Sequence, residues 1–254
     1  MSYNVTVSGK DYEGIDSVKL PITGTNRYKT FGDVDGIIDG TIESVESDTA
    51  TRVKKCAFAD CKKLKTAKLP NAERITISAF DSCSALSEID FSNAIQIQNN
   101  AFYGCSSLAG EYVFPKVTWP VGTNAFTNCT GITKMVLPVV QGTNSCAFKG
   151  CSGLKVLDLG SAIGNTTIAA DKIDSTAFEG LTNLEALILR NPTKVVPLDS
   201  VNAFYTTPID GGTASNTCFI YVPSALVDSY KSNSMWSTFA NQFRAIEDYP
   251  DICG

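Results

Sequence analysis

The dipeptide Ala-Phe occurs seven times in this chain at nearly regular intervals. Its copies stand at 57–58, 79–80, 101–102, 125–126, 147–148, 177–178 and 203–204, so the intervals are 22, 22, 24, 22, 30 and 26 residues. A period of twenty to thirty residues is typical of a solenoid, in which each repeat forms one coil that contacts only its neighbours. Solenoids usually present an extended binding surface, so the repeat favours a binding role over catalysis.

The residues after each Ala-Phe pair indicate how one coil is built. Most copies continue as Ala-Phe-x-x-Cys-x-x-Leu and then carry two apolar residues two positions apart. An interval of two places both side chains on one face of a strand, whereas the earlier intervals of three and four suit a turn of α- or 3₁₀-helix. A second short apolar run precedes several copies, as in Ile75 with Ile77, Ile95 with Ile97, and Val117 with Trp119. Each coil is therefore expected to contain a strand, a bend, a helical turn and a second strand.

Five cysteines occupy the same position of successive repeats, and we predict that they fill the core. They are Cys61, Cys83, Cys105, Cys129 and Cys151. Leu181 takes this position in the sixth repeat, and leucine can replace a small buried hydrophobe but not a metal ligand or a disulfide partner. The other cysteines are Cys56, Cys146, Cys218 and Cys253; thiols are expected, with a Cys56–Cys61 or Cys146–Cys151 bridge as the alternative. Zinc-finger spacing is absent, because the chain has no CxxC motif and no histidine.

The repeat resembles the leucine-rich repeats of the BspA type, which read Ala-Phe-x-x-Cys-x-x-Leu-x-x-Ile-x-Leu-Pro. The resemblance covers about residues 50–223, and it departs from the pattern at Leu181, in the interval of 30 residues and in the seventh copy, which lacks the Cys and Leu positions. It implies an α/β leucine-rich-repeat solenoid, dominated by strands with short helical turns, of about six to seven coils plus end caps.

Both ends of the chain lie outside the repeat, which suggests three parts. We expect a small β-structured cap or docking segment at 1–45, the solenoid at 46–223, and a helical cap and tail at 224–254. Two or three short strands are predicted at the start from the alternating apolar residues Tyr3, Val5 and Val7, then Val18, Leu20 and Ile22. This first segment resembles the N-terminal segments of phage and prophage tail-associated proteins. In the last part, Trp236, Phe239 and Phe243 have helical spacing and are expected to form a lid on the final coil.

Composition excludes several classes of function. A net charge of −5 and scattered lysines and arginines argue against a nucleic-acid partner, since phosphate binding depends on clustered positive charge. The absence of histidine excludes Ser-His-Asp and Cys-His catalysis within the chain. No segment reaches the about 20 apolar residues of a membrane span, and the first thirty residues lack the apolar core of a secretion leader. We therefore predict a protein that is not an enzyme, has no cofactor and does not insert into a membrane. A metal site at Asp171 and Asp174 is a weaker alternative to a solvated loop.

One outward position recurs in each predicted strand, between the two inward apolar residues. Its side chains should form a row along the outer face of the sheet, with charges on either side of an apolar middle. Because exposed apolar side chains can mark a contact surface, we predict a binding row of Lys68, Asp90, Val113, Val136, Asp158, Ile188 and Tyr221. The alternative is that the N-terminal segment or a neighbouring chain covers this row.

These features predict a non-enzymatic scaffold that binds proteins or has a structural role. The strand-rich start and the expected lack of a leader favour an appendage of a phage virion or tail, which would contact the host surface or other virion proteins. The alternative is a bacterial cell-surface or extracellular adhesin, the role commonly attached to this repeat family. The partner would be a protein or a cell-surface glycan, and a homo-oligomer is compatible with the sequence.

Overall fold

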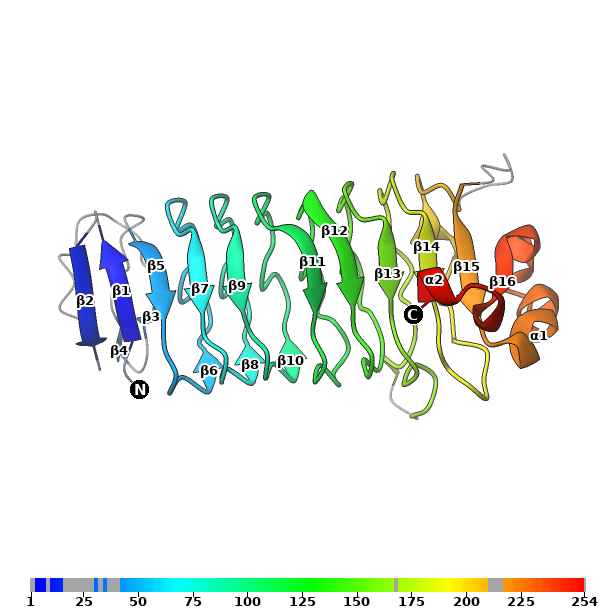
Figure 1. Ribbon diagram of the computed structural model, residues 1–254, viewed down its shortest axis with the longest axis horizontal. Coiled ribbons are helices and arrows are strands. Elements are labelled where there is room, and N and C mark those ends of the chain that lie inside the picture. The colour runs from blue at the N-terminus through cyan, green and yellow to red at the C-terminus, as the bar shows by residue number, and fades with distance from the viewer. Residues whose placement is uncertain are drawn as a thin grey trace.

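The chain forms an elongated rod of stacked coils (Figure 1). The computed structural model describes residues 42–166, 169–209 and 217–253, and the backbone of four short strands before residue 42. These four are β1 (Tyr3–Val7), β2 (Lys10–Ile15), β3 (Thr30–Phe31) and β4 (Val34–Asp35). The predicted leucine-rich-repeat solenoid is confirmed, and its main face carries nine parallel strands, in fair agreement with six to seven coils plus end caps.

The nine strands of the main face pair in register from one coil to the next within two groups, β5 to β9 and β11 to β16. They are β5 (Ile42–Glu46), β7 (Thr66–Lys68), β9 (Glu88–Asp90), β11 (Ala109–Val113), β12 (Gly131–Val136), β13 (Val156–Asp158), β14 (Ala186–Ile188), β15 (Phe219–Val222) and β16 (Phe243–Ala245). Equivalent positions of the repeat are partners, as in Ala67 with Ile89 and Leu157 with Leu187. Each position of the repeat therefore forms a straight row along the rod.

The N-terminal strands continue the main sheet. β1 pairs antiparallel with β5 and β2 pairs antiparallel with β1, so the order at this end is β2-β1-β5-β7-β9. Tyr3, Val5 and Val7 lie in β1, as predicted, whereas Val18, Leu20 and Ile22 fall outside the described residues.

A second, narrower face lies behind the main sheet. It comprises β6 (Arg52–Val53), β8 (Arg74–Ile75) and β10 (Gln96–Ile97), and single parallel bridges continue it. The inward residue stands five or six positions before each repeated phenylalanine, and all seven of these residues are buried: Val53, Ile75, Ile97, Val121, Thr143, Ile173 and Leu198. In the predicted apolar runs Ile97 is buried as the second residue, whereas Ile77 and Trp119 are exposed and do not face the core.

The repeated phenylalanines form a continuous stack inside the rod. From Phe58 to Phe148 the ring centroids of neighbouring coils are 5.2–5.5 Å apart, and the ring planes differ by 2–12°. The N–H of each phenylalanine donates to the carbonyl of the repeated alanine in the next coil, at 2.8 Å for Phe58 to Ala79. Offset stacks of this kind contribute beyond the area that they bury, so the Ala-Phe pair joins the coils both by packing and by hydrogen bonding.

The segments around the first six Ala-Phe pairs form single i→i−3 turns, in agreement with the helical or 3₁₀ turn expected from the spacing, and the seventh pair lies in the 3₁₀-helix η1 (Val201–Phe204). The residue just before each repeated cysteine or its equivalent has a left-handed backbone: Asp60, Ser82, Gly104, Asn128, Gly150, Gly180 and Thr206, with φ between 57° and 79°. A left-handed residue ends an i→i−3 turn and prevents a helix from continuing. Gly, Asn and Asp, the residues that tolerate this conformation best, account for most of the set.

The five repeated cysteines are buried, as predicted, and their thiols have a further role. Each of four thiols donates to a phenylalanine carbonyl of the preceding coil: Cys83 to Phe58 at 2.9 Å, Cys105 to Phe80 at 3.0 Å, Cys129 to Phe102 at 3.1 Å and Cys151 to Phe126 at 2.9 Å. Burial raises the pKa of the Cys151 thiol to about 12. All nine cysteines are thiols, so the alternative bridges Cys56–Cys61 and Cys146–Cys151 are wrong.

The C-terminal part closes the last coil with several short elements. They are η3 (Ser224–Leu226), α1 (Val227–Ser232), η4 (Ser237–Gln242), η5 (Ile246–Asp248) and α2 (Pro250–Cys253). Trp236 and Phe239 pack against Phe204 with ring centroids 5.7 and 5.0 Å away, so both act as the expected lid. Phe243 is also buried, but it lies in strand β16 and extends the sheet.

Thr143 is the polar member of the inward column on the narrow face, and it provides a test of the core. Among the described residues, its hydroxyl is the buried side-chain oxygen or nitrogen without a hydrogen-bond partner. An unsatisfied buried hydroxyl costs about 1–3 kcal/mol, and valine has the same shape. Thr143→Val should therefore raise the unfolding free energy by about 1 kcal/mol in urea titrations. Val121→Thr, the matched control one coil earlier, should lower it, and a less stable Thr143→Val variant would contradict this assignment.

The buried thiols predict a loss of stability in alkaline solution. An unfolded thiol loses its proton near its ordinary pKa of 9.0, whereas the folded Cys151 keeps its proton up to a pKa of about 12. Above pH 9 the unfolded state therefore binds fewer protons, and stability falls by up to about 1.4 kcal/mol per pH unit for this thiol. Urea unfolding between pH 7 and pH 10.5 should show a shallower decline for Cys151→Ala than for the unsubstituted chain. Equal declines would contradict the prediction.

Candidate functional site

The outer face of the main sheet carries the predicted binding row. Strand pairing aligns Lys68 with Asp90, and it aligns Val113, Val136, Asp158, Ile188 and Tyr221 in succession. The seven residues thus hold one position on successive strands. The register follows from the core, because the inward neighbours of these residues are fixed by packing.

The row is divided into an open part and a covered part. Val113 is 58% exposed, and Lys68, Asp90 and Val136 are half-buried. In contrast, Asp158, Ile188 and Tyr221 are only 6%, 1% and 2% exposed, so the expectation that they face outward into solvent is wrong. Neither the N-terminal segment nor a neighbouring chain covers them, because the cover is the C-terminal tail of the same chain.

The tail folds back over the outer face from the end of the rod. α2 lies in front of β14, and the chain runs toward β13 (Figure 1). Cys253 joins Ala186, Ile188 and Tyr221 in one apolar cluster, and Ile246 and Tyr249 pack against it. The rings of Tyr221 and Tyr249 meet edge to face at 5.3 Å. Burial raises the pKa of both Tyr221 and Cys253, which agrees with a dry contact between tail and sheet.

Arg190 fastens the tail to the sheet. Its guanidinium donates to Asp158 through Nε at 2.8 Å, and its NH2 group donates to the backbone carbonyl of Cys253. The other oxygen of Asp158 accepts the N–H of Gly160 at 3.0 Å. Asp158 therefore orients Arg190, and Arg190 holds the end of the tail through a charge-assisted hydrogen bond.

The open part of the face has an apolar centre and a charged border. We call the outward residues of β7, β9, β11 and β12 the open sheet face. Val113 and Val136 are paired neighbours at its centre. Ion pairs stand beside them, Lys134 with Glu111 at 3.7 Å and Lys68 with Glu88 at 2.9 Å. Exposed ion pairs contribute little to stability, but an apolar centre within a polar rim is the usual anatomy of a protein interface.

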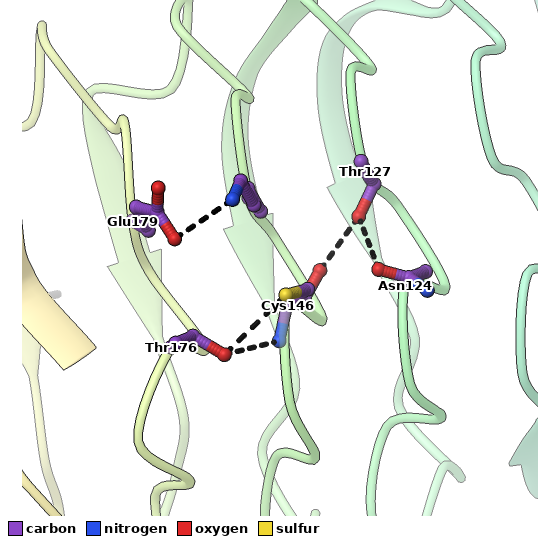
Figure 2. A network of polar contacts seen from close by, with 6 residues as sticks. Asn124, Thr127, Cys146, Thr176 and Glu179 are labelled. Atoms are coloured by element: carbon purple, nitrogen blue, oxygen red, sulfur yellow. Dashed lines mark hydrogen bonds and ion pairs between the residues drawn. The ribbon is translucent and has the colours of Figure 1, made fainter. Parts of the chain in front are cut away.

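A polar network on the turn side joins three coils (Figure 2). The Thr127 hydroxyl donates to the Cys146 carbonyl at 2.7 Å, and the Thr176 hydroxyl accepts the Cys146 N–H at 3.2 Å. The ammonium of Lys149 lies 2.9 Å from the Glu179 carboxylate. The chain has no imidazole to activate the Cys146 thiol, so this network can fasten the coils together but does not resemble a nucleophilic site.

Asp171 and Asp174, the alternative metal ligands, organise the long interval between the fifth and sixth repeats. Asp171 accepts the N–H groups of Gly164 and Thr166, and Asp174 accepts the Ser145 hydroxyl at 2.7 Å. In the part of the chain that the structure describes, no group of three or more acidic, cysteine or histidine residues could hold a metal ion. Within the same residues, no helix has the length and apolar character of a membrane span.

A groove that the sequence did not predict lies on the narrow face, beside Trp119. It encloses about 200 Å³ and is bordered by Gln96, Gln98, Asn99 and Asn144. Trp119 was expected to belong to an apolar strand with Val117, yet Val117 is buried and Trp119 is 52% exposed. The proline that follows Trp119 and the glycine at 122 were the signals that the chain bends there.

Among known protein families, one model matches the repeat. The family model described as the BspA type leucine rich repeat region matches six copies, over residues 41–155 and 111–221. Among solved structures, a leucine-rich repeat protein from Bacteroides ovatus ATCC 8483 is 15% identical, with a TM-score of 0.31, and the match covers 80% of this chain and 71% of that one. No curated protein matches the chain.

We call the hydrogen bond from Arg190 to the Cys253 carbonyl the clasp, and it can be tested through the Cys253 thiol. A hydrogen bond to a charged group contributes about 1.5–3 kcal/mol, so Arg190→Ala should raise the open fraction of the tail about tenfold or more. Iodoacetamide should then alkylate Cys253 faster by that factor, as measured by mass spectrometry of the cysteine peptides. Lys155→Ala, which removes an exposed ion pair with Glu185 just before strands β13 and β14, is the control and should leave the rate unchanged. An unchanged Cys253 rate in Arg190→Ala would show that the clasp does not hold the tail.

Proposed function

Because the chain belongs to the BspA-type leucine-rich repeat family, we propose that it is a non-enzymatic scaffold that binds a protein partner through the open sheet face. The observation that carries this proposal is the division of one apolar row into a covered part and an uncovered part. Ile188 and Tyr221 are buried beneath the tail, whereas Val113 and Val136 continue the same row without a cover among the described residues.

The covered part indicates which chemistry this face accommodates. The tail presents Ile246, Tyr249 and Cys253 to the sheet and is fixed by the Arg190 hydrogen bond. A partner segment with one or two apolar side chains and a polar flank would match Val113, Val136 and the ion pairs beside them in the same manner. The centre of such a contact contributes most of the affinity, and the charged rim contributes register and specificity.

We place this scaffold on a phage virion or tail, attached by its N-terminal end and presenting the open sheet face to the host surface or to other virion proteins. The support is the strand order at that end. β2 is the outermost strand of the sheet and pairs with β1 on one side only among the described residues. An unpaired strand edge is a natural place for another protein to add a strand. A bacterial cell-surface adhesin is the competing placement.

One experiment tests both the contact surface and the placement. A glutamate at each centre position would put charge where an apolar contact is proposed, so Val113→Glu with Val136→Glu should weaken binding to host cells at least tenfold. The doubly substituted chain should still sediment with phage particles in a density gradient, because the attachment end is unchanged. Ile77→Glu is the matched control, since Ile77 is an exposed β-branched residue outside the sheet face, and it should retain both properties.

Two results would contradict the proposal in different ways. Equal cell binding by the doubly substituted chain and the unsubstituted chain would exclude the open sheet face as the contact. Recovery of the native chain only from particle-free or cell-surface fractions would exclude the virion placement and favour the adhesin.

A further inference from the structure

Two glycines of the narrow face, close to the groove, allow the backbones of neighbouring coils to approach closely. A Cβ atom on Gly122 would lie 2.3 Å from the Gln98 carbonyl carbon, and one on Gly142 would lie 2.0 Å from the Ala170 carbonyl oxygen. Neither position can carry a side chain without displacing backbone. The equivalent positions of neighbouring coils carry side chains, such as Gln98 and Asn144 in place of Gly122. Ala170, from the long interval before the sixth repeat, borders the groove together with Gly122.

The side chains around the groove are polar but uncharged. Gln96, Gln98 and Asn99 come from one coil, Trp119 from the next and Asn144 from the third. None of the described residues that line the groove is ionisable, although 47 residues of the chain, 21 basic and 26 acidic, are charged. Such a lining does not select for an anion or a cation.

Three of the four amides are held in place before any ligand arrives. Gln98 Nε2 donates to Gln96 Oε1 at 3.2 Å, and Asn99 Oδ1 accepts the Thr123 N–H at 3.0 Å. The latter bond fixes the Asn99 side chain and leaves its NH₂ group to donate elsewhere. An amide side chain offers both donors and acceptors, and a group whose rotamer is already fixed loses less entropy on binding.

We propose that this groove binds a neutral saccharide, with one sugar ring against the exposed indole of Trp119 and the sugar hydroxyls hydrogen-bonded to the surrounding amides. A sugar ring combines an apolar C–H face with hydroxyl groups that both donate and accept, which matches an indole surrounded by amides. The volume of about 200 Å³ suits one ring, since pockets for drug-sized ligands enclose about 300–1,000 Å³. The site is separate from the open sheet face and does not depend on it.

A proline-rich peptide is the other ligand class that Trp grooves bind, and the lining favours the sugar. Such peptides dock into grooves lined by several aromatic side chains, which receive successive prolines. Among the described residues that line this groove, Trp119 is the sole aromatic one. Four amide side chains around one indole offer more hydrogen bonds than a polyproline backbone can use.

The test is a titration with a panel of neutral mono- and disaccharides: glucose, galactose, mannose, rhamnose, N-acetylglucosamine and their α- and β-linked dimers. Binding is followed by tryptophan fluorescence and by saturation-transfer NMR. The chain has two tryptophans, and Trp236 is fully buried, so a quench or shift on sugar addition reports on Trp119. At least one panel member should bind, and Trp119→Ala and Asn144→Ala should each weaken it at least tenfold. Trp119→Phe, which keeps a flat ring, should weaken it less than Trp119→Ala.

Tyr205→Ala is the matched control, because Tyr205 is a similarly exposed aromatic residue that does not line this groove, and it should leave saccharide affinity unchanged. The Val113→Glu, Val136→Glu chain should also bind the sugar normally, which separates this site from the sheet-face contact. Thermal unfolding of each variant checks that it is folded. The proposal is overturned if no panel member binds, if binding survives Trp119→Ala unchanged, or if a proline-rich peptide binds at Trp119 and no saccharide does.

Discussion

Each coil of this rod is joined to the next through the repeated Ala-Phe pair. The phenylalanine N–H bonds to the alanine carbonyl of the following coil at 2.8–3.0 Å, and the rings stack inside. This contact fixes both the spacing and the register of the coils. The sheet rows on the outside are straight because the inner stack is straight, so the position of every surface residue depends on a contact that it does not make itself.

Residues at one position of the repeat have two roles on the outer face of the main sheet. Toward the C-terminal end, Ile188 and Tyr221 form an apolar strip that would be costly to expose, and the tail buries it. Full burial of such side chains contributes about 1.5–3 kcal/mol each. Nearer the middle, Val113 and Val136 stand at the same position of the repeat without this cover. The tail is thus both a cap for the array and a natural example of a segment bound to this face.

The period and the core positions could be predicted from the sequence. Because they recur from coil to coil, the agreement between coils resolves positions that a single short apolar run would leave ambiguous between helix and strand. The left-handed position before each cysteine could also have been found, since Gly104, Asn128, Gly150 and Gly180 share it. The path of the tail could not, because Ile246, Tyr249 and Cys253 occur once and their target lies far away in sequence. The prediction that Trp119 faces the core was wrong for a related reason. An interval of two from Val117 indicates the same face only while the chain stays extended, and here the chain turns at the following proline.

The repeat pattern of the narrow face is least regular around residues 142–144, and the side chains there differ most from those that packing alone requires. Gly142 and Thr143 are consecutive, and each departs from its column: a glycine on the outside and a hydroxyl in the apolar core, with the groove amide Asn144 next in the chain. Thr143 weakens the core at this coil, and Gly142 admits the Ala170 carbonyl. Stability alone favours valine at 143 and gives no reason for the amides. Where an array departs from its own pattern at a cost in stability, a binding role for the departing residues explains what packing does not.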